Sequence, residues 1–300
     1  MRLLSNLAHF IQGVLAALLF ALNTIVMCTV LWVFAIFKFL LPDGPLRQRL
    51  RHGLTKLAET WISFNNFGLS LDPGLEWRVH VPENLDPKGC YLVNSNHQTW
   101  VDIPVLQYAL NRRAPFMRFF LKKQLIWVPF LGPAWWALDM PFMERHSREE
   151  IARNPALKGR DLESARRACE KLEGIPASVM NFLEGTRFSE AKRAAGEGRW
   201  KHLLKPRIGG IGQVLYSLGD RLDAMLDVTI VYPAGAPSLW QLLSGRVPRI
   251  DVHVREVPIP ASLFGRQAHA EPALRAELAD WVNALWDEKD AMIEATLQAR

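Results

Sequence analysis

Two side chains suited to proton transfer, His97 and Asp102, lie five residues apart in the run NSNHQTWVD at positions 94–102. The run follows an expected strand and begins an expected helix, so a turn can bring the carboxylate of Asp102 to one ring nitrogen of His97. That contact would fix the tautomer of the imidazole and leave its second nitrogen free to accept a proton. Taken alone, the pair is more typical of a histidine capped at the start of a helix.

The sequence lacks the residue patterns of a nucleophilic serine or cysteine and of a zinc cluster. No serine or cysteine stands in a G-x-S-x-G nucleophile setting. The three cysteines, Cys28, Cys90 and Cys169, are too few and too far apart for a disulfide framework or a zinc cluster. We therefore expect no metal and no cofactor, and we expect the histidine to act as a base on the hydroxyl of a substrate.

Three further blocks follow the run around His97. They are Lys122-Lys123-Gln124-Leu125 with Pro129, Gly132 and Arg145; Glu184-Gly185-Thr186-Arg187; and an apolar strand ending in proline, Val228–Pro233. In order and spacing the four blocks resemble those of the glycerophospholipid acyltransferases, typified by 1-acyl-sn-glycerol-3-phosphate acyltransferase. Segments 187–192, 202–207, 227–230 and 286–290 are similar to a bacterial membrane branch related to lysocardiolipin acyltransferases. One departure is Leu183, which stands where many members have proline.

This resemblance implies an enzyme that moves a fatty acyl group from acyl-CoA or acyl carrier protein to the sn-2 hydroxyl of lysophosphatidic acid. The product would be phosphatidic acid, made in phospholipid biosynthesis. Another lysophospholipid as acceptor is the first alternative, followed by a lipid thioesterase or lipase and by a non-catalytic membrane scaffold. The expected partners are membrane phospholipids, the acceptor and the donor, with no nucleic acid. Backbone N–H groups at the helix start after His97, or near Gly132, are candidates to stabilise the oxyanion.

The same resemblance assigns roles to residues. His97 would be the general base on the acceptor hydroxyl, and Asp102 would orient it. Arg187 can bind two phosphate oxygens and Thr186 can donate a hydroxyl, while Glu184 would hold the local geometry. The full set expected to bind substrate is Lys122, Lys123, Arg145, Glu184, Gly185, Thr186 and Arg187.

Composition excludes several classes of protein. The 300 residues allow one large domain or two ordinary ones. With 49% hydrophobic and 22% charged residues, the chain is neither disordered nor collagenous. Its 36 Lys and Arg against 30 Asp and Glu give a net charge of +6, a mild excess that suits an anionic surface without indicating nucleic acid.

An uncharged tract at the amino end indicates a membrane anchor. Residues 3–37 carry no formal charge unless His9 is protonated. As one helix they would be about 52 Å long, against a hydrocarbon core of about 30 Å. Either a single tilted span over Val14–Leu40 or two shorter helices hinged at Asn23-Thr24, lying in or re-entering the membrane, would fit. The tract is too long for a cleaved signal peptide.

The distribution of basic residues predicts the orientation of this anchor. Only Arg2 precedes the tract, whereas five basic residues follow it: Lys38, Arg47, Arg49, Arg51 and Lys56. By the positive-inside rule the remainder of the chain stays in the cytoplasm. We therefore expect a membrane anchor over 1–42 and a cytoplasmic acyltransferase domain over 43–300, at a bacterial inner membrane.

Apolar runs that alternate with helical patterns predict the fold of that domain. Strands are expected at 76–81, 90–94, 117–121, 140–143, 178–183, 226–232 and 250–257, and helices at 103–110, 162–172, 210–218 and 271–297. The last of these helices is amphipathic. This order predicts an α/β fold with a mixed sheet flanked by helices, and the resemblance implies the glycerolipid acyltransferase fold.

A second apolar run, Leu125–Phe142, is as long as a membrane span. It contains Pro129, Gly132 and Asp139, and expected strands flank it closely. We therefore expect a hydrophobic lobe or groove wall on the cytoplasmic domain, with aromatic residues that suit an acyl-chain groove or ordinary core packing.

Overall fold

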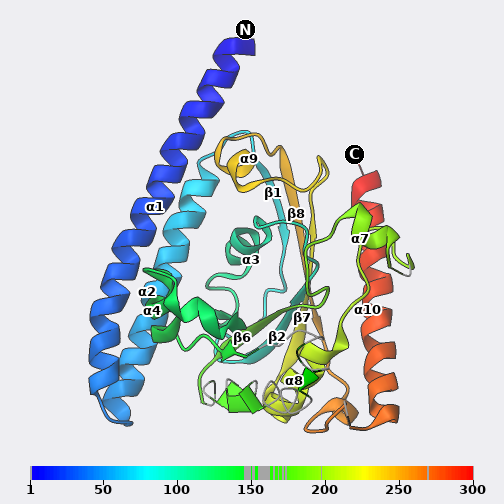
Figure 1. Cartoon of the computed structure of the whole chain (residues 1–300). Coiled ribbons are helices and arrows are strands. Elements are labelled where there is room, and N and C mark those ends of the chain that lie inside the picture. Colours follow the sequence, from blue (N-terminus) through cyan, green and yellow to red (C-terminus); the bar gives the residue numbers. More distant parts are fainter. Residues whose placement is uncertain are drawn as a thin grey trace.

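In the computed structural model, helices cover both faces of a six-stranded sheet, and a long helical hairpin lies along one side of the molecule (Figure 1). The chain starts at the free end of the hairpin and finishes in a helix on the opposite side of the sheet. The structure describes residues 2–144, 150, 153–154, 163–164, 166–167, 169–170, 172, 174–196, 198–268 and 270–299.

The large sheet has the strand order β1-β8-β7-β2-β6-β3. Among the described strands of this sheet, β7 and β8 pair antiparallel and every other pair is parallel. The predicted mixed α/β class is therefore confirmed. The strands are β1 (Glu76–His80), β2 (Cys90–Ser95), β3 (Met117–Phe119), β6 (Ala177–Phe182), β7 (Ala224–Val231) and β8 (Arg249–Val257).

Each face of the sheet has its own apolar core. One core contains Val105 and Leu106 of α3 (Asp102–Leu110), packed beside strand residues such as Leu226. The other lies under α8 (Ile208–Leu218) and α10 (Pro272–Gln298), where Trp286 is fully buried. Strands buried on both faces read as continuous apolar runs in a sequence, and all eight residues of β7 are buried.

A buried ion pair joins α10 to β7. Lys289 is fully buried, and its Nζ lies 2.8 Å from Oδ1 of Asp227 and 2.5 Å from the carbonyl oxygen of Val228. Arg255 of β8 donates to the other carboxylate oxygen of Asp227 at 2.8 Å. Breaking one partner of such a buried pair is strongly destabilising, because the remaining charge is left without compensation. The network therefore fixes α10 against the strand that carries part of the site.

The helical hairpin consists of α1 (Arg2–Leu40) and α2 (Pro45–Ser70). Helix α1 is continuous, so of the two alternatives the helix pair hinged at Asn23-Thr24 is wrong. Instead the Asn23 side chain donates to the carbonyl oxygen of Trp61 at 3.1 Å and to Oδ1 of Asn65 at 2.7 Å. A partner on α2 thus satisfies the polar side chain within the helix, and the chain turns between Leu40 and Pro45.

Helix α1 contacts the sheet domain near both of its ends. Near its start, Nδ1 of His9 lies 2.8 Å from the carbonyl oxygen of Ser244, and a Cβ on Gly13 would lie 2.8 Å from the ring of Trp240. Near its end, Nζ of Lys38 lies 2.6 Å from Oδ1 of Asp139. These contacts are about 44 Å apart along the helix, so α1 lies lengthwise on the domain.

The apolar run 125–142 folds onto the hairpin. It forms part of the 3-10 helix η1 (Lys123–Trp127), the short helix α4 (Leu131–Ala137) and the start of β5 (Phe142–Met143), which pairs with β4 (Leu121–Lys122). Ala134 and Leu138 pack with Leu31 of α1 and Leu54 of α2. The predicted hydrophobic lobe is confirmed, although the strand expected over 117–121 is divided between β3 and β4.

Most other expected elements are present with small shifts of boundary. Strands β1, β2, β6, β7 and β8 and helices α3, α8 and α10 overlap the predicted ranges. Of the helix expected over 162–172, residues 163–164, 166–167 and 169–170 are described and are helical. Two short helices that the sequence analysis did not expect, α7 (Glu190–Ala194) and α9 (Leu239–Leu243), have serine side chains at their N-caps.

Candidate active site

The turn that follows β2 is fixed to β7 by Asn96. Its side-chain amide donates to the carbonyl oxygen of Ile230 at 2.9 Å, and its Oδ1 accepts from the N–H of Ile230 at 2.9 Å. The amide of Gln98 donates to the same carbonyl oxygen at 3.0 Å. The backbone on both sides of His97 is therefore held against a central strand.

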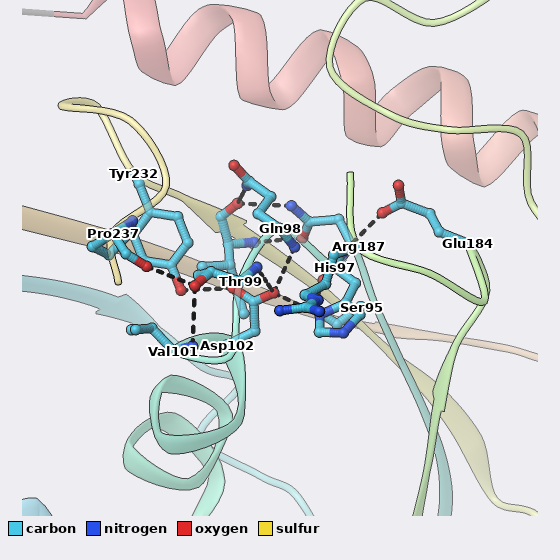
Figure 2. Close-up of polar contacts among 12 residues, drawn as sticks. Ser95, His97, Gln98, Thr99, Val101, Asp102, Glu184, Arg187, Tyr232 and Pro237 are labelled. Atoms are coloured by element: carbon cyan, nitrogen blue, oxygen red, sulfur yellow. Dashed lines mark hydrogen bonds and ion pairs between the residues drawn. The ribbon is translucent and has the colours of Figure 1, made fainter. Parts of the chain in front are cut away.

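Asp102, at the first turn of α3, is fully buried and accepts four hydrogen bonds (Figure 2). Its Oδ2 accepts from Nδ1 of His97 at 2.8 Å and from the backbone N–H groups of Gln98 at 2.6 Å and Thr99 at 2.9 Å. Its Oδ1 accepts from the hydroxyl of Tyr232 at 2.7 Å. Four donors and a helix N-terminus stabilise a negative charge at this position.

The imidazole of His97 is held by two contacts. Because a carboxylate can only accept, Nδ1 carries the hydrogen directed at Asp102. One face of the ring stacks on Phe182 of β6, with centroids 4.0 Å apart and planes 20° apart. Nε2 has no hydrogen-bond partner among the described residues, and the side chain keeps 15% of its exposure. This nitrogen can accept a proton from a bound hydroxyl.

Glu184 holds two backbone segments together. Its Oε1 accepts from the N–H of His97 at 2.8 Å, and its Oε2 accepts from the N–H of Leu204 at 3.1 Å. Burial raises the pKa of Glu184 to about 7, and the two N–H donors oppose that increase. The carboxylate thus positions the residue that carries the imidazole.

The segment after Glu184 returns to His97. Gly185 has φ +66°, a conformation that favours glycine, and a Cβ there would lie 2.9 Å from the Arg207 side chain. The N–H of Phe188 donates to the carbonyl oxygen of His97 at 2.7 Å. The first and third sequence blocks are therefore joined through both the N–H and the carbonyl of His97.

Arg187 extends from this segment over an indole ring. Its guanidinium carbon lies 4.8 Å from the ring of Trp100, which is exposed. Arg187 is itself exposed, and no described side chain forms a hydrogen bond or ion pair with its guanidinium. Oγ1 of Thr186 accepts from Nζ of Lys192 at 2.7 Å. A cation with free donors thus lies one residue before Phe188, whose N–H donates to the carbonyl oxygen of His97.

The remaining basic residues expected at the site are not joined to it in the described part of the chain. Lys122 is exposed on β4, and Lys123 is exposed and lies 2.7 Å from Glu144 in an ion pair. No described contact joins either lysine to His97 or Arg187. Arg145 lies outside the described residues.

Comparison with known proteins decides the family. A family model described as Acyltransferase matches residues 76–232, which is more than half of the chain. The chain belongs to the acyltransferase family. All of the described site residues above lie within the matched range.

Relatives of this acyltransferase carry more specific names. It is 27% identical over 217 residues to 1-acyl-sn-glycerol-3-phosphate acyltransferase delta of Homo sapiens, covering 68% of this chain and 52% of that one. It is 29% identical over 184 residues to the human gamma enzyme, covering 58% of this chain and 44% of that one. The acyltransferase described here thus spans about half the length of the curated relatives that it matches.

A solved structure shares the fold. The 1-acyl-sn-glycerophosphate acyltransferase of Thermotoga maritima superposes with a TM-score of 0.53 at 19% identity, over 92% of this acyltransferase and 97% of that chain. At this identity the likeness concerns the fold alone. It extends beyond the matched family range to include most of the chain.

The sequence analysis of this acyltransferase missed Phe182, Trp100 and Tyr232. Tyr232 lies in the fourth block, but its phenol was given no role, because a contact with Asp102 spans 130 residues of sequence. Burial and the nearby carboxylate raise the pKa of Tyr232 well above its usual value, so the phenol stays protonated and donates. The only available signal for this contact was a tyrosine at the end of an apolar strand.

Among the described residues, no group of three or more His, Cys, Asp or Glu side chains is placed to hold a metal ion. In the part of the chain that the structure describes, Cys28, Cys90 and Cys169 are free thiols, and burial raises the pKa of Cys90 and Cys169.

Proposed function

We propose that this protein transfers a fatty acyl group from acyl-CoA or acyl carrier protein to the sn-2 hydroxyl of lysophosphatidic acid, giving phosphatidic acid. The observation that carries the proposal is the 2.8 Å contact between Nδ1 of His97 and Oδ2 of Asp102, which leaves Nε2 available as a base. The names of the relatives support the choice of acceptor. The bacterial branch and the lysocardiolipin relation stay predictions.

In this reaction one proton passes from the acceptor hydroxyl to His97 and then from His97 to the leaving thiolate. Nε2 of His97 takes the proton of the acceptor hydroxyl as its oxygen attacks the thioester carbonyl carbon. The carbon–sulfur bond then breaks, and the same proton passes to the departing thiolate. Asp102 stabilises the imidazolium between these two steps. A positioned base of this kind contributes about 10²–10⁴-fold to the rate, so positioning and electrostatic stabilisation supply the remainder.

The structure narrows the choice of groups for the oxyanion. The N–H groups of Gln98 and Thr99 are already donated to Asp102. The N–H of Gly132 is donated to the carbonyl oxygen of Val128 at 2.8 Å. These three N–H groups are among the expected donors, and they cannot serve the oxyanion while their present bonds are kept.

Arg187 is the cation that we assign to the acceptor phosphate. Its guanidinium can bind two phosphate oxygens in a fork, while its stacking on Trp100 keeps the group in place. The N–H of Phe188 ties the adjacent residue to His97. A phosphate held by Arg187 would therefore bring the glycerol hydroxyl of the same acceptor toward Nε2.

We further propose that the apolar face of α1 rests in the bacterial inner membrane, with the sheet domain on the cytoplasmic side. Leu4–Leu40 is the one described helix apolar enough to cross a bilayer, and many of its large side chains are exposed. If α1 crossed the bilayer perpendicular to its plane, His9 and Lys38 would lie near opposite faces of the membrane. A domain on one side of the membrane could not then keep the contacts of both residues. A helix lying in one leaflet keeps both contacts. Release of the protein by alkaline carbonate without detergent would contradict this proposal.

The test of the activity is a screen of donors against acceptors with detergent-purified protein. We expect His97→Ala to lower transfer to lysophosphatidic acid by about 10²–10⁴-fold. The matched control is His80→Ala, an exposed histidine on the edge strand β1, which should keep the native rate. Native transfer by His97→Ala would refute the assignment of the base. Hydrolysis of acyl-CoA that added acceptor leaves unchanged would instead indicate a thioesterase.

A further inference from the structure

A large cavity lined by cations begins at the third sequence block. Its volume is about 1170 Å³, and Glu184 and Thr186 form part of its wall, whereas Arg187 does not. Among its described lining residues Glu184 is the one carboxylate. The cations of its wall are Lys192, Arg193, Arg199, Lys205, Arg207 and Arg275. The cavity is therefore a separate basic region from the one formed by Arg187 and Trp100.

Some of these cations have internal partners. Arg193 pairs with Glu190 at 2.9 Å, and Arg199 pairs with Asp287 at 2.6 Å. Nζ of Lys192 donates to two neutral oxygens, so its charge is not compensated by those contacts. Even when both ion pairs, Lys205 and Glu184 are left out of account against the remaining cations Lys192, Arg207 and Arg275, the described residues of the cavity keep an excess of positive charge.

Two arginines of the wall are free to bind a ligand. Neither Arg207 nor Arg275 forms a hydrogen bond or ion pair through its side chain with any described residue, and both are exposed. Arg207 packs on Gly185, while Arg275 comes from α10, far away in sequence. The first turn of α8 also lines the cavity at Gly209, where helix N–H groups favour an anion.

The shape of the cavity indicates a small ligand that carries several negative charges. Pockets for small molecules commonly measure about 300–1,000 Å³, and this cavity is close to the upper end of that range. A folded acidic protein has a convex surface, which would not enter a cavity of this size. Apolar residues such as Trp200, Leu203 and Ala276 line the same wall and suit a nucleobase or an alkyl arm. A nucleotide with several phosphates and an apolar arm satisfies both requirements.

We propose that this cavity binds the phosphorylated nucleotide of a coenzyme A thioester, the acyl donor of the transfer proposed above, on which this inference rests. Glu184 belongs to the cavity wall and also accepts the N–H of His97 at 2.8 Å. A thioester arm that extends from the cavity past residues 184–186 therefore arrives beside the base. The donor and acceptor then use different cations, Arg207 and Arg275 for the donor and Arg187 for the acceptor.

The double variant Arg207→Gln, Arg275→Gln tests this assignment. We measure binding of coenzyme A to the detergent-purified full chain by calorimetry, with pantetheine, which has no phosphates, as the matched ligand. A hydrogen bond to a charged group contributes about tenfold or more to affinity. The Kd for coenzyme A should rise at least about tenfold, while pantetheine binding does not change. In transfer assays the KM for acyl-CoA should rise by a similar factor, and the KM for lysophosphatidic acid should stay within about twofold.

The control variant is Arg78→Gln, which removes an exposed arginine of β1 outside the cavity and should leave both constants unchanged. Unchanged coenzyme A binding and an unchanged KM for acyl-CoA in the double variant would overturn the inference. So would a rise in KM confined to acyl carrier protein as donor. Because coenzyme A binding is measured without turnover, it can be scored in His97→Ala protein, so failure of the transfer reaction and failure of the donor site give different results.

Discussion

The turn 97–102 and the segment 184–207 border the same histidine, but they are built differently. In the turn, Asp102 is fully buried and each of its oxygens already has donors from the protein. In the segment, Arg187 and Arg207 are exposed, and their guanidinium groups form no hydrogen bond or ion pair with the described residues. The hydrogen bonds of the turn are complete without a substrate, whereas the two guanidinium groups of the segment are open to a ligand. The difference separates residues that should control the rate of the chemical step from residues that should control substrate binding.

Asp102→Asn should have the largest effect on the chemical step. The amide oxygen can keep the three hydrogen bonds that Oδ2 accepts, but the amide N–H₂ cannot accept from Tyr232, and the substitution removes the negative charge that stabilises the imidazolium of His97. We expect kcat to fall by about 10²–10⁴-fold with the KM values nearly unchanged. Steady-state kinetics with both substrates measure this. The control is Asp220→Asn at an exposed position, which should behave as wild type. If Asp102→Asn lowered the affinity for substrate without lowering kcat, the turn 97–102 would not be the region that controls the chemical step.

Glu184 connects the two regions, and its titration should appear in stability. Its pKa is about 7 in the folded protein, against an ordinary value of about 4.5, so the folded state binds the proton more tightly. Stability should therefore fall as pH rises from about 4.5 to 7, by about 3 kcal/mol from this group. Glu184→Gln should flatten the free energy of unfolding across that window.

Denaturant titrations at pH 5 and pH 7.5 measure this difference for Glu184→Gln, wild type and the exposed control Glu190→Gln. The control should keep the slope of the wild type. An equal slope in Glu184→Gln and wild type would show that the carboxyl is ionised throughout the window, and that its two N–H donors outweigh its burial.

Arg187→Ala should affect binding more than the rate of the chemical step. We expect the KM for lysophosphatidic acid to rise about tenfold to a hundredfold, because a hydrogen-bonded charge pair is lost. Arg187→Lys keeps the charge but not the fork, so it should recover only part of the affinity. Monoacylglycerol, which lacks the phosphate, is the matched acceptor, and its use should not change. Equal losses with both acceptors would make Arg187 a structural residue instead.

Much of the fold could be predicted because buried strands leave a clear pattern. The runs at 178–183 and 226–232 correspond to β6 and β7, which lie in the middle of the sheet with apolar residues on both faces. Short elements were harder. The run 117–121 is divided because Leu121 pairs with Phe142, a neighbour that only the tertiary structure supplies. The sequence could not decide between one helix and a hinged pair over residues 3–37, because the partner of Asn23 lies on another helix.

The site shows the same distinction between local and distant contacts. The contact of His97 with Asp102 is local, and five residues of sequence were enough to suggest it. Tyr232 reaches Asp102 across 130 residues, and its role depends on β7 lying beside β2. The basic cavity combines residues 184–209 with residues 272–283, so no single stretch of sequence carries its pattern.

The attachment of α1 at both ends bears on how substrates reach the site. Because His9 and Lys38 each contact the sheet domain, the helix cannot tilt or slide independently of it. If α1 rests in one leaflet, the depth of His97 relative to the lipid headgroups is set by the fold and not by thermal motion of a tether. A lipid whose hydroxyl lies at that depth would reach the imidazole without leaving the bilayer. A lipid whose hydroxyl lies shallower or deeper would not reach it, so the fixed depth would select among acceptors.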